Sequence, residues 1–171
     1  MVKLMMTVAD HPLIVKTVHW NSEAATQATA QCLAQQPAVR DALVTLRGDL
    51  GAGKTTFARH LLTALGVTGR IKSPTYAVVE AYAVLPTDAP ELNMWHCDFY
   101  RFNDPDEWED AGFRDIFASP GLKLVEWPDK AGAYLPAPDL AIAIELLPTE
   151  QRCVTLSAFT ATGAALLEAL A

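Results

Sequence analysis

Hydrophobic and polar positions along the 171-residue chain switch between a strand-like and a helix-like period. Short apolar runs, several of them rich in β-branched residues, predict strands at 13–20, 42–47, 76–84, 91–97 and 122–126. Two late runs, at 139–146 and 152–159, predict neighbouring strands that form a hairpin or a sheet edge.

The segments between these runs carry helix signals. Asn21 or Ser22 can cap a helix that reaches about residue 35, and Pro37 ends it. Residues 55–65 predict a helix closed by a glycine. An acidic helical turn begins where Asp104 precedes a proline, and a short helix rich in Ala and Leu closes the chain. The Gly, Ser and Pro content of 68–76 predicts a loop.

The alternation of strand, loop and helix predicts an α/β fold with a mixed sheet. We expect a parallel centre, because helices separate the middle strands, and antiparallel edge strands. The length fits one domain over residues 1–171, with no internal repeat or linker.

Composition narrows the class of partner. Apolar residues make up 51% of the chain and charged residues 19%, which is typical of a globular soluble protein. The net charge of −7 repels nucleic acid over most of the surface, so we expect any RNA contact to be carried mainly by another protein.

Cysteine usage and hydropathy predict a cytoplasmic location. Cys32, Cys97 and Cys153 are widely spaced, which favours reduced thiols over a disulfide framework or a zinc site. No apolar run reaches the length of a membrane span. Residues 1–15 carry one lysine and are interrupted by polar residues, so we expect no secretion signal there.

The stretch GDLGAGKTT, residues 48–56, matches G-x-x-x-x-G-K-[ST] between an apolar strand and an amphipathic helix. Its glycines let successive backbone N–H groups bind phosphates, and the helix dipole adds to the attraction. Lys54 should reach the outer phosphates of ATP, and the Thr55 hydroxyl should ligate Mg²⁺. A plain glycine-rich turn is the alternative, which motif and context together disfavour. The predicted binding residues are Gly48, Asp49, Leu50, Gly51, Ala52, Gly53, Lys54, Thr55 and Thr56. The fold expectation sharpens to a three-layer, P-loop NTPase-like domain.

Two acids follow apolar strands, as a P-loop site requires. Asp98 and Glu126 each stand at the end of such a run and can bind Mg²⁺ or orient an attacking water. We therefore predict Lys54, Asp98 and Glu126 as catalytic residues and Thr55, Asp98 and Glu126 as metal ligands. The sequence leaves open which acid contacts metal and which contacts water.

Other nucleotide-using classes are less favoured. The nearest approach to a guanine-reading N/T-K-x-D motif is PDK at 128–130, which does not match. A small-molecule kinase, which remains an alternative, generally needs an arginine-bearing lid. The arginines after the loop lie in no stretch that looks like a lid: Arg59, Arg70, Arg101, Arg114 and Arg152.

Four ordered motifs, LRGDLGAGKTTFAR, KSPTY, HCDFYR and LVEWPDK, resemble the TsaE family over about residues 22–146. The resemblance implies the ATPase component of the bacterial machinery that makes threonylcarbamoyladenosine on tRNA. It implies ATP and Mg²⁺ as cofactors and the TsaB–TsaD heterodimer as partner, with tRNA contacted only through the complex. Two features depart from the family pattern: a longer connection between Tyr82 and Asn93, and the extra helix after Thr160.

The resemblance also implies residue roles. Ser73, Pro74 and Thr75 fall on a switch segment facing the phosphates, with Thr75 sensing the nucleotide; a proline turn is the plainer alternative. Glu126 would act at the γ-phosphate end. Trp127 would pack near the nucleotide, unless it is a buried structural tryptophan.

The HCDFYR motif places the family's important acid at Asp98. His96 beside it is either a packed core histidine or a catalytic one, and Arg101 is either a surface ion-pair residue or a partner contact. Arg70 and Lys72 are the strongest local exception to the acidic surface, though solvated loop charges explain them as well.

The chain shows no arginine finger of its own, so we expect tight ATP binding and slow hydrolysis until a partner completes the site. Two hypotheses remain open: an ATPase that drives turnover of the complex, and a nucleotide-gated binding module in which hydrolysis is incidental.

Overall fold

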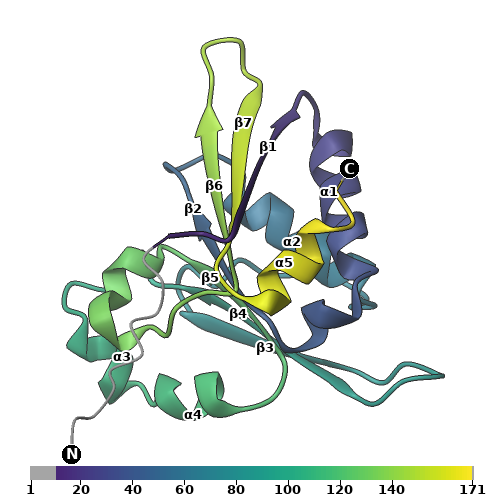
Figure 1. Cartoon of the computed structure of the whole chain (residues 1–171). Coiled ribbons are helices and arrows are strands. Elements are labelled where there is room, and N and C mark those ends of the chain that lie inside the picture. The colour runs from purple at the N-terminus through teal and green to yellow at the C-terminus, as the bar shows by residue number, and fades with distance from the viewer. Residues whose placement is uncertain (1–10, 171) are drawn as a thin grey trace, which may run out of the picture.

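A seven-stranded mixed sheet forms the middle layer of the fold, and the computed structural model describes residues 11–170 (Figure 1). The strand order across the sheet is β1-β7-β6-β2-β5-β4-β3. The strands are β1 Ile14–Trp20, β2 Leu43–Arg47, β3 Val79–Val84, β4 Leu92–Asp98, β5 Leu122–Glu126, β6 Leu140–Leu146 and β7 Arg152–Ala158.

The centre of the sheet is parallel and its edges are antiparallel. Strand β2 pairs in parallel with β5 and β6, and β4 pairs in parallel with β5. The antiparallel pairs are β1 with β7, β6 with β7, and β3 with β4. The predicted mixed sheet and the β6–β7 hairpin are therefore confirmed.

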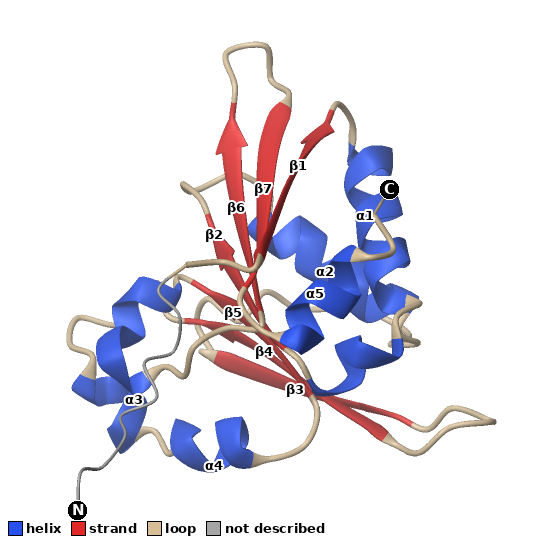
Figure 2. Cartoon of the chain, in the orientation of Figure 1, coloured by secondary structure: helices blue, strands red, loops and turns tan. Residues whose placement is uncertain are grey.

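Helices cover both faces of the sheet, which makes three layers (Figure 2). One face carries α1 Glu23–Ala34, α2 Lys54–Ala64 and α5 Ala161–Leu167, with the 3₁₀ helix η1 Pro37–Asp41 beside them. The other carries α3 Asp106–Asp110, α4 Phe113–Ala118 and the 3₁₀ segment η2 Pro128–Tyr134.

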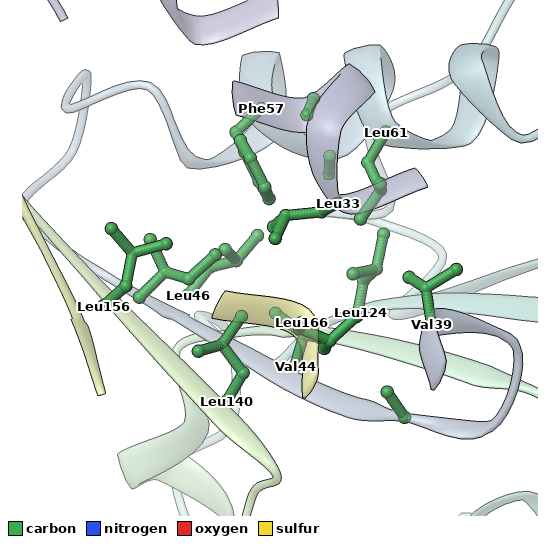
Figure 3. Close-up of a cluster of buried hydrophobic side chains, with 14 of the residues drawn as sticks. Leu33, Val39, Val44, Leu46, Phe57, Leu61, Leu124, Leu140, Leu156 and Leu166 are labelled. Atoms are coloured by element: carbon green, nitrogen blue, oxygen red, sulfur yellow. The ribbon is translucent and has the colours of Figure 1, made fainter. Parts of the chain in front are cut away.

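The side-chain alternation of the strands divides the core between the two faces. Val44, Leu46 and Leu124 point into the cluster beneath α1 and α2 (Figure 3). Leu43 and Val125 point the other way, into a cluster rich in aromatic residues from α3 and α4. Both clusters are buried, so β2 and β5 carry apolar residues on both faces, as expected for strands covered on both sides.

Four local features differ from the expectation or were absent from it, and one of them is the unpredicted 3₁₀ helix η1. Strand β3 begins at Val79 rather than at 76, because the Val78 N–H donates to the Pro74 carbonyl in a turn (2.7 Å) and Val78 has a φ of 69°. The helix α4 and the 3₁₀ segment η2 were not predicted; they span six and seven residues, too few to show helical periodicity.

The ends of the predicted helices follow the expected caps. Ser22 Oγ accepts from the Ala25 N–H at 3.3 Å and begins α1.

The expectation about a secretion signal concerns mainly residues 1–10, which lie outside the described part of the chain. Within residues 11–170, no helix has the length and apolar character needed to cross a membrane.

Candidate nucleotide site

The loop of residues 48–53 leaves the end of β2 and enters α2, as the motif predicts. Gly48 and Gly53 have φ of +151° and +113°, a region that residues with a side chain rarely adopt. A Cβ at Gly48 would stand 2.6 Å from the Ile144 carbonyl oxygen of β6. The loop therefore packs against the neighbouring strand at a distance that glycine alone allows.

A cavity of about 260 Å³ opens over this loop, at the edge of the sheet where β2, β5 and β4 end. It brings together ten of the predicted site residues: Leu50, Gly51, Gly53, Lys54, Thr55, Thr56, Thr75, Asp98, Glu126 and Trp127. Gly48, Asp49 and Ala52 do not line the cavity. They form the back of the loop, and Ala52 is buried.

Lys54, the first residue of α2, is buried beside the loop. Its Nζ donates to the carbonyl oxygens of Gly48 at 2.6 Å and Asp49 at 2.9 Å. Burial lowers the pKa of this ammonium, while the charges of Glu126, Asp98 and Asp49 act in the opposite direction. The cation thus stands over the loop, within electrostatic reach of these three acids.

Glu126 is held from two directions. The Thr55 hydroxyl donates to its Oε1 at 2.8 Å, with Oε2 at 3.1 Å, and His96 Nε2 lies 3.0 Å from the same Oε1. When Glu126 is a carboxylate, this bond requires a proton on His96 Nε2, because a carboxylate oxygen only accepts. His96 lies in the interior and does not line the cavity, and its hydrogen bond to Glu126 connects it to the site.

Asp98 is held by a different pair of donors. The Thr75 hydroxyl donates to Oδ2 at 3.1 Å, and the Tyr100 backbone N–H donates to Oδ1 at 2.9 Å. Burial raises the pKa of this carboxyl and the Glu126 charge raises it further, whereas the two donors and His96 lower it. Ser73 Oγ lies 2.9 Å from Thr75 Oγ1. Because Thr75 also bonds to Asp98, residues 73–75 are connected to this carboxyl.

Trp127 is half-buried and forms one wall of the cavity. Its ring centroid lies 4.4 Å from Lys54 Nζ and 5.0 Å from the Tyr100 ring. It has a left-handed backbone, with φ 56° and ψ 51°, directly before η2. The side chain therefore contacts both Lys54 and the aromatic core cluster.

Two cavity residues were absent from the sequence prediction. Tyr100 follows Asp98 closely, and Arg152 reaches the loop from β7, where its Nε donates to the Ala52 carbonyl at 2.6 Å. The predicted hairpin could have pointed to Arg152, since an antiparallel strand begins at the edge of the sheet where its parallel neighbours end.

Three predicted surface cations do not line the cavity. Arg70, Lys72 and Arg101 are exposed, and Arg101 stacks over the Tyr76 ring at 4.2 Å.

A comparison with known protein families covers all the residues that line this cavity. The family model described as "Threonylcarbamoyl adenosine biosynthesis protein TsaE" matches residues 20–154, which include the loop, both acids and Arg152. The chain belongs to the TsaE family. The four motifs found in the sequence all fall within the matched TsaE region.

Several curated TsaE proteins are similar to this chain. The protein from Haemophilus influenzae is 43% identical over 60% of this chain, and the match spans 62% of that protein, less than two thirds of its length. The Bacillus subtilis protein is 39% identical over 71% of this chain, and the match spans 70% of the Bacillus protein. Each is named a tRNA threonylcarbamoyladenosine biosynthesis protein.

A solved structure shares the fold. The crystal structure of YdiB from Bacillus subtilis superposes with a TM-score of 0.69 at 31% identity, covering 91% of this chain and 94% of that one. This agreement and the sheet order support the predicted α/β, P-loop-like architecture.

Proposed function

We propose that this chain, as one domain over residues 1–171, binds ATP with Mg²⁺ and hydrolyses it slowly during tRNA threonylcarbamoyladenosine formation. One observation carries the proposal: a P-loop cavity in which Lys54 is flanked by two buried strand-end acids, Asp98 and Glu126. The loop supplies phosphate-binding N–H groups, and each acid lies on the wall of the same cavity.

The donor set fits Mg²⁺, which takes hard oxygen ligands. The Thr55 hydroxyl and the Glu126 carboxylate are in contact at 2.8 Å, and Asp98 lines the same cavity. These three would hold the ion, which would neutralise charge on the outer phosphates when bound. Because Glu126 contacts Thr55, we favour it as the acid bound to the metal directly, and Asp98 as the acid that holds the metal through a water.

Slow hydrolysis by the chain alone follows from the placement of its cations. Lys54 stands at the outer phosphates, whereas the other cavity cation, Arg152, belongs to the opposite side of the loop. Charge that develops on the transferred phosphoryl group therefore has Lys54 as its nearest protein cation, and a partner that adds a cation or orders the switch segment should accelerate the reaction.

The partner we propose is the TsaB–TsaD heterodimer, with tRNA reached only through that complex in the cytosol. The net charge of −7 supports an indirect tRNA contact. Leu50 lines the cavity and is 68% exposed, and Tyr76, which follows the switch segment, is 83% exposed, so both offer apolar surface to a partner.

A nucleotide-gated binding module is the second candidate function. The bond from the Thr75 hydroxyl to Asp98 favours it, because this bond joins the switch segment directly to the nucleotide cavity. Bound ATP could then order the segment for docking, and hydrolysis would be incidental.

The test is ATP hydrolysis by the purified chain, alone and with the TsaB–TsaD pair, with Lys54→Ala as the blank. We expect slow turnover alone, strong stimulation by the pair, and loss of both in the blank. A fast rate alone, with no response to the pair, would contradict the proposal and return attention to a small-molecule kinase.

A further inference from the structure

A separate cavity of about 320 Å³ opens at the other edge of the sheet, where β2, β5 and β6 begin. Because these strands are parallel, this edge lies opposite the strand ends that carry the nucleotide cavity. Three charged side chains line it, Lys123, Asp41 and Asp139, together with an apolar wall that includes Leu43 and Phe117. None of the residues that line this cavity lines the nucleotide cavity.

Lys123 is a buried cation whose charge is only partly compensated. Its side chain is 7% exposed, and burial lowers the pKa of its ammonium, although the charges of Asp41 and Asp139 act in the opposite direction. Among the described residues its Nζ donates to one acceptor, the Ser119 carbonyl oxygen. Asp41 Oδ1 stands 3.9 Å away, beyond hydrogen-bond length, and the centroid of the Trp95 ring lies at 5.6 Å. The ammonium therefore has further N–H donors to offer to an oxygen ligand.

The two carboxylates differ in what they can still bind. Asp139 is fully used, because its Oδ2 accepts from the Leu43 N–H at 2.8 Å and its Oδ1 accepts from the Thr160 hydroxyl at 2.7 Å. The Asp41 side chain is 74% exposed, and its Oδ1 accepts from the Gly121 N–H at 3.0 Å. Within residues 11–170 no donor bonds to the second oxygen of Asp41. Asp41 therefore presents a carboxylate oxygen that can bind a cation at the same cavity as the buried ammonium.

We propose that this cavity binds a small zwitterion, an α-amino acid with an apolar side chain. Its carboxylate would pair with Lys123 and its ammonium with Asp41, and its side chain would pack on Leu43, Phe117 and Pro136. A simple anion fits less well, because the two carboxylates of the cavity outnumber its one cation. A simple amine would leave the spare donors of Lys123 without an acceptor. The cavity volume lies near the lower end of the range for small-molecule sites, which suits a ligand of this size.

The test measures binding of L-leucine to the full chain by calorimetry. Two analogues of the same shape serve as ligand controls: 4-methylpentanoate lacks the ammonium, and 3-methylbutylamine lacks the carboxylate. Lys123→Met and Asp41→Asn each remove one charge from the cavity, and Asn keeps an oxygen that can accept from the Gly121 N–H. Lys130→Met, at an exposed lysine of η2, is the matched control variant. Circular dichroism identifies the variants that are folded, and Asp41→Asn, at an exposed position, tests the site even if Lys123→Met unfolds.

We expect the wild type to bind L-leucine with a Kd of about 1 mM or tighter, and each analogue about tenfold or more weakly. Lys123→Met and Asp41→Asn should each weaken L-leucine binding about tenfold or more, and Lys130→Met should leave it unchanged. The inference is overturned by a wild type that does not bind L-leucine, by an analogue that binds as tightly, or by folded cavity variants that bind unchanged. Each of these results leaves the proposed function standing, because the two cavities share no residue.

Discussion

The Thr55 hydroxyl donates to Glu126 Oε1 at 2.8 Å, and this bond joins the first turn of α2 to the end of β5. His96 Nε2 lies 3.0 Å from the same oxygen, so the carboxylate is fixed from the loop side and from the interior. A fixed acid beside a predicted Mg²⁺ ligand needs little reorganisation during the reaction. Glu126 is therefore the residue whose replacement best separates hydrolysis from binding.

Glu126→Gln should retain ATP binding and lose hydrolysis. The amide keeps the size and an oxygen that can accept from Thr55, but it lacks the negative charge that would hold Mg²⁺ against the outer phosphates. We expect a fall in ATP turnover of about 100-fold or more, measured by phosphate release with the partner pair present. If tRNA modification by the complex survives in this variant, the binding-module hypothesis holds; if it falls with hydrolysis, the ATPase hypothesis holds.

Asp98→Asn should stabilise the fold while it impairs the site. Burial raises the pKa of Asp98, so the folded state disfavours its ionised form, and the cost is full above the raised pKa and absent below the ordinary value of 3.8. We expect a gain on the order of 1 kcal/mol at pH 7 that shrinks as the pH falls toward 4. Urea unfolding at a series of pH values measures it. A gain that stays constant with pH would contradict this electrostatic origin.

Cys97 should resist thiol reagents in the native protein. Burial raises the pKa of its thiol, the Asp98 charge raises it further, and the thiolate is the form that reacts. Cys32 and Cys153 are half-buried and serve as internal controls. Iodoacetamide labelling followed by mass spectrometry should modify those two first and reach Cys97 only after urea unfolds the chain. Labelling of all three at equal rates would show that β4 is more accessible than its contacts indicate.

Gly48→Ala should destabilise the fold more than Gly69→Ala. Both glycines have a φ that a side chain disfavours, a strain of about 1–2 kcal/mol in either variant. At Gly48 the added Cβ also meets the Ile144 carbonyl at 2.6 Å, whereas at Gly69 it meets nothing within 4 Å. We expect an additional loss of about 1–3 kcal/mol at Gly48 in urea unfolding. Equal losses would mean that the loop moves away from β6 at little cost.

Local pattern was sufficient for most of the sheet. Strand β5 was predicted to the residue, because its apolar run ends at Glu126 and is followed by Trp127 and Pro128, which cannot continue the strand. The β6–β7 hairpin was predicted because two apolar runs follow each other over a short connection. The start of β3 was placed three residues early, because residues 76–78 continue the apolar run, although the turn between Pro74 and Val78 keeps them out of the strand.

The sequence by itself determined the loop, its lysine and the two strand-end acids. A P-loop is encoded within nine neighbouring residues, and each acid directly follows an apolar run, whichever strands that run pairs with. Only the tertiary structure decided which donors hold each acid: Thr55 and His96 at Glu126, and Thr75 at Asp98. It also brought Arg152 to Ala52 across a sequence separation of 100 residues. Contacts of this kind depend on strand order and on the direction of each strand, which the packing of the whole sheet sets and no local pattern encodes.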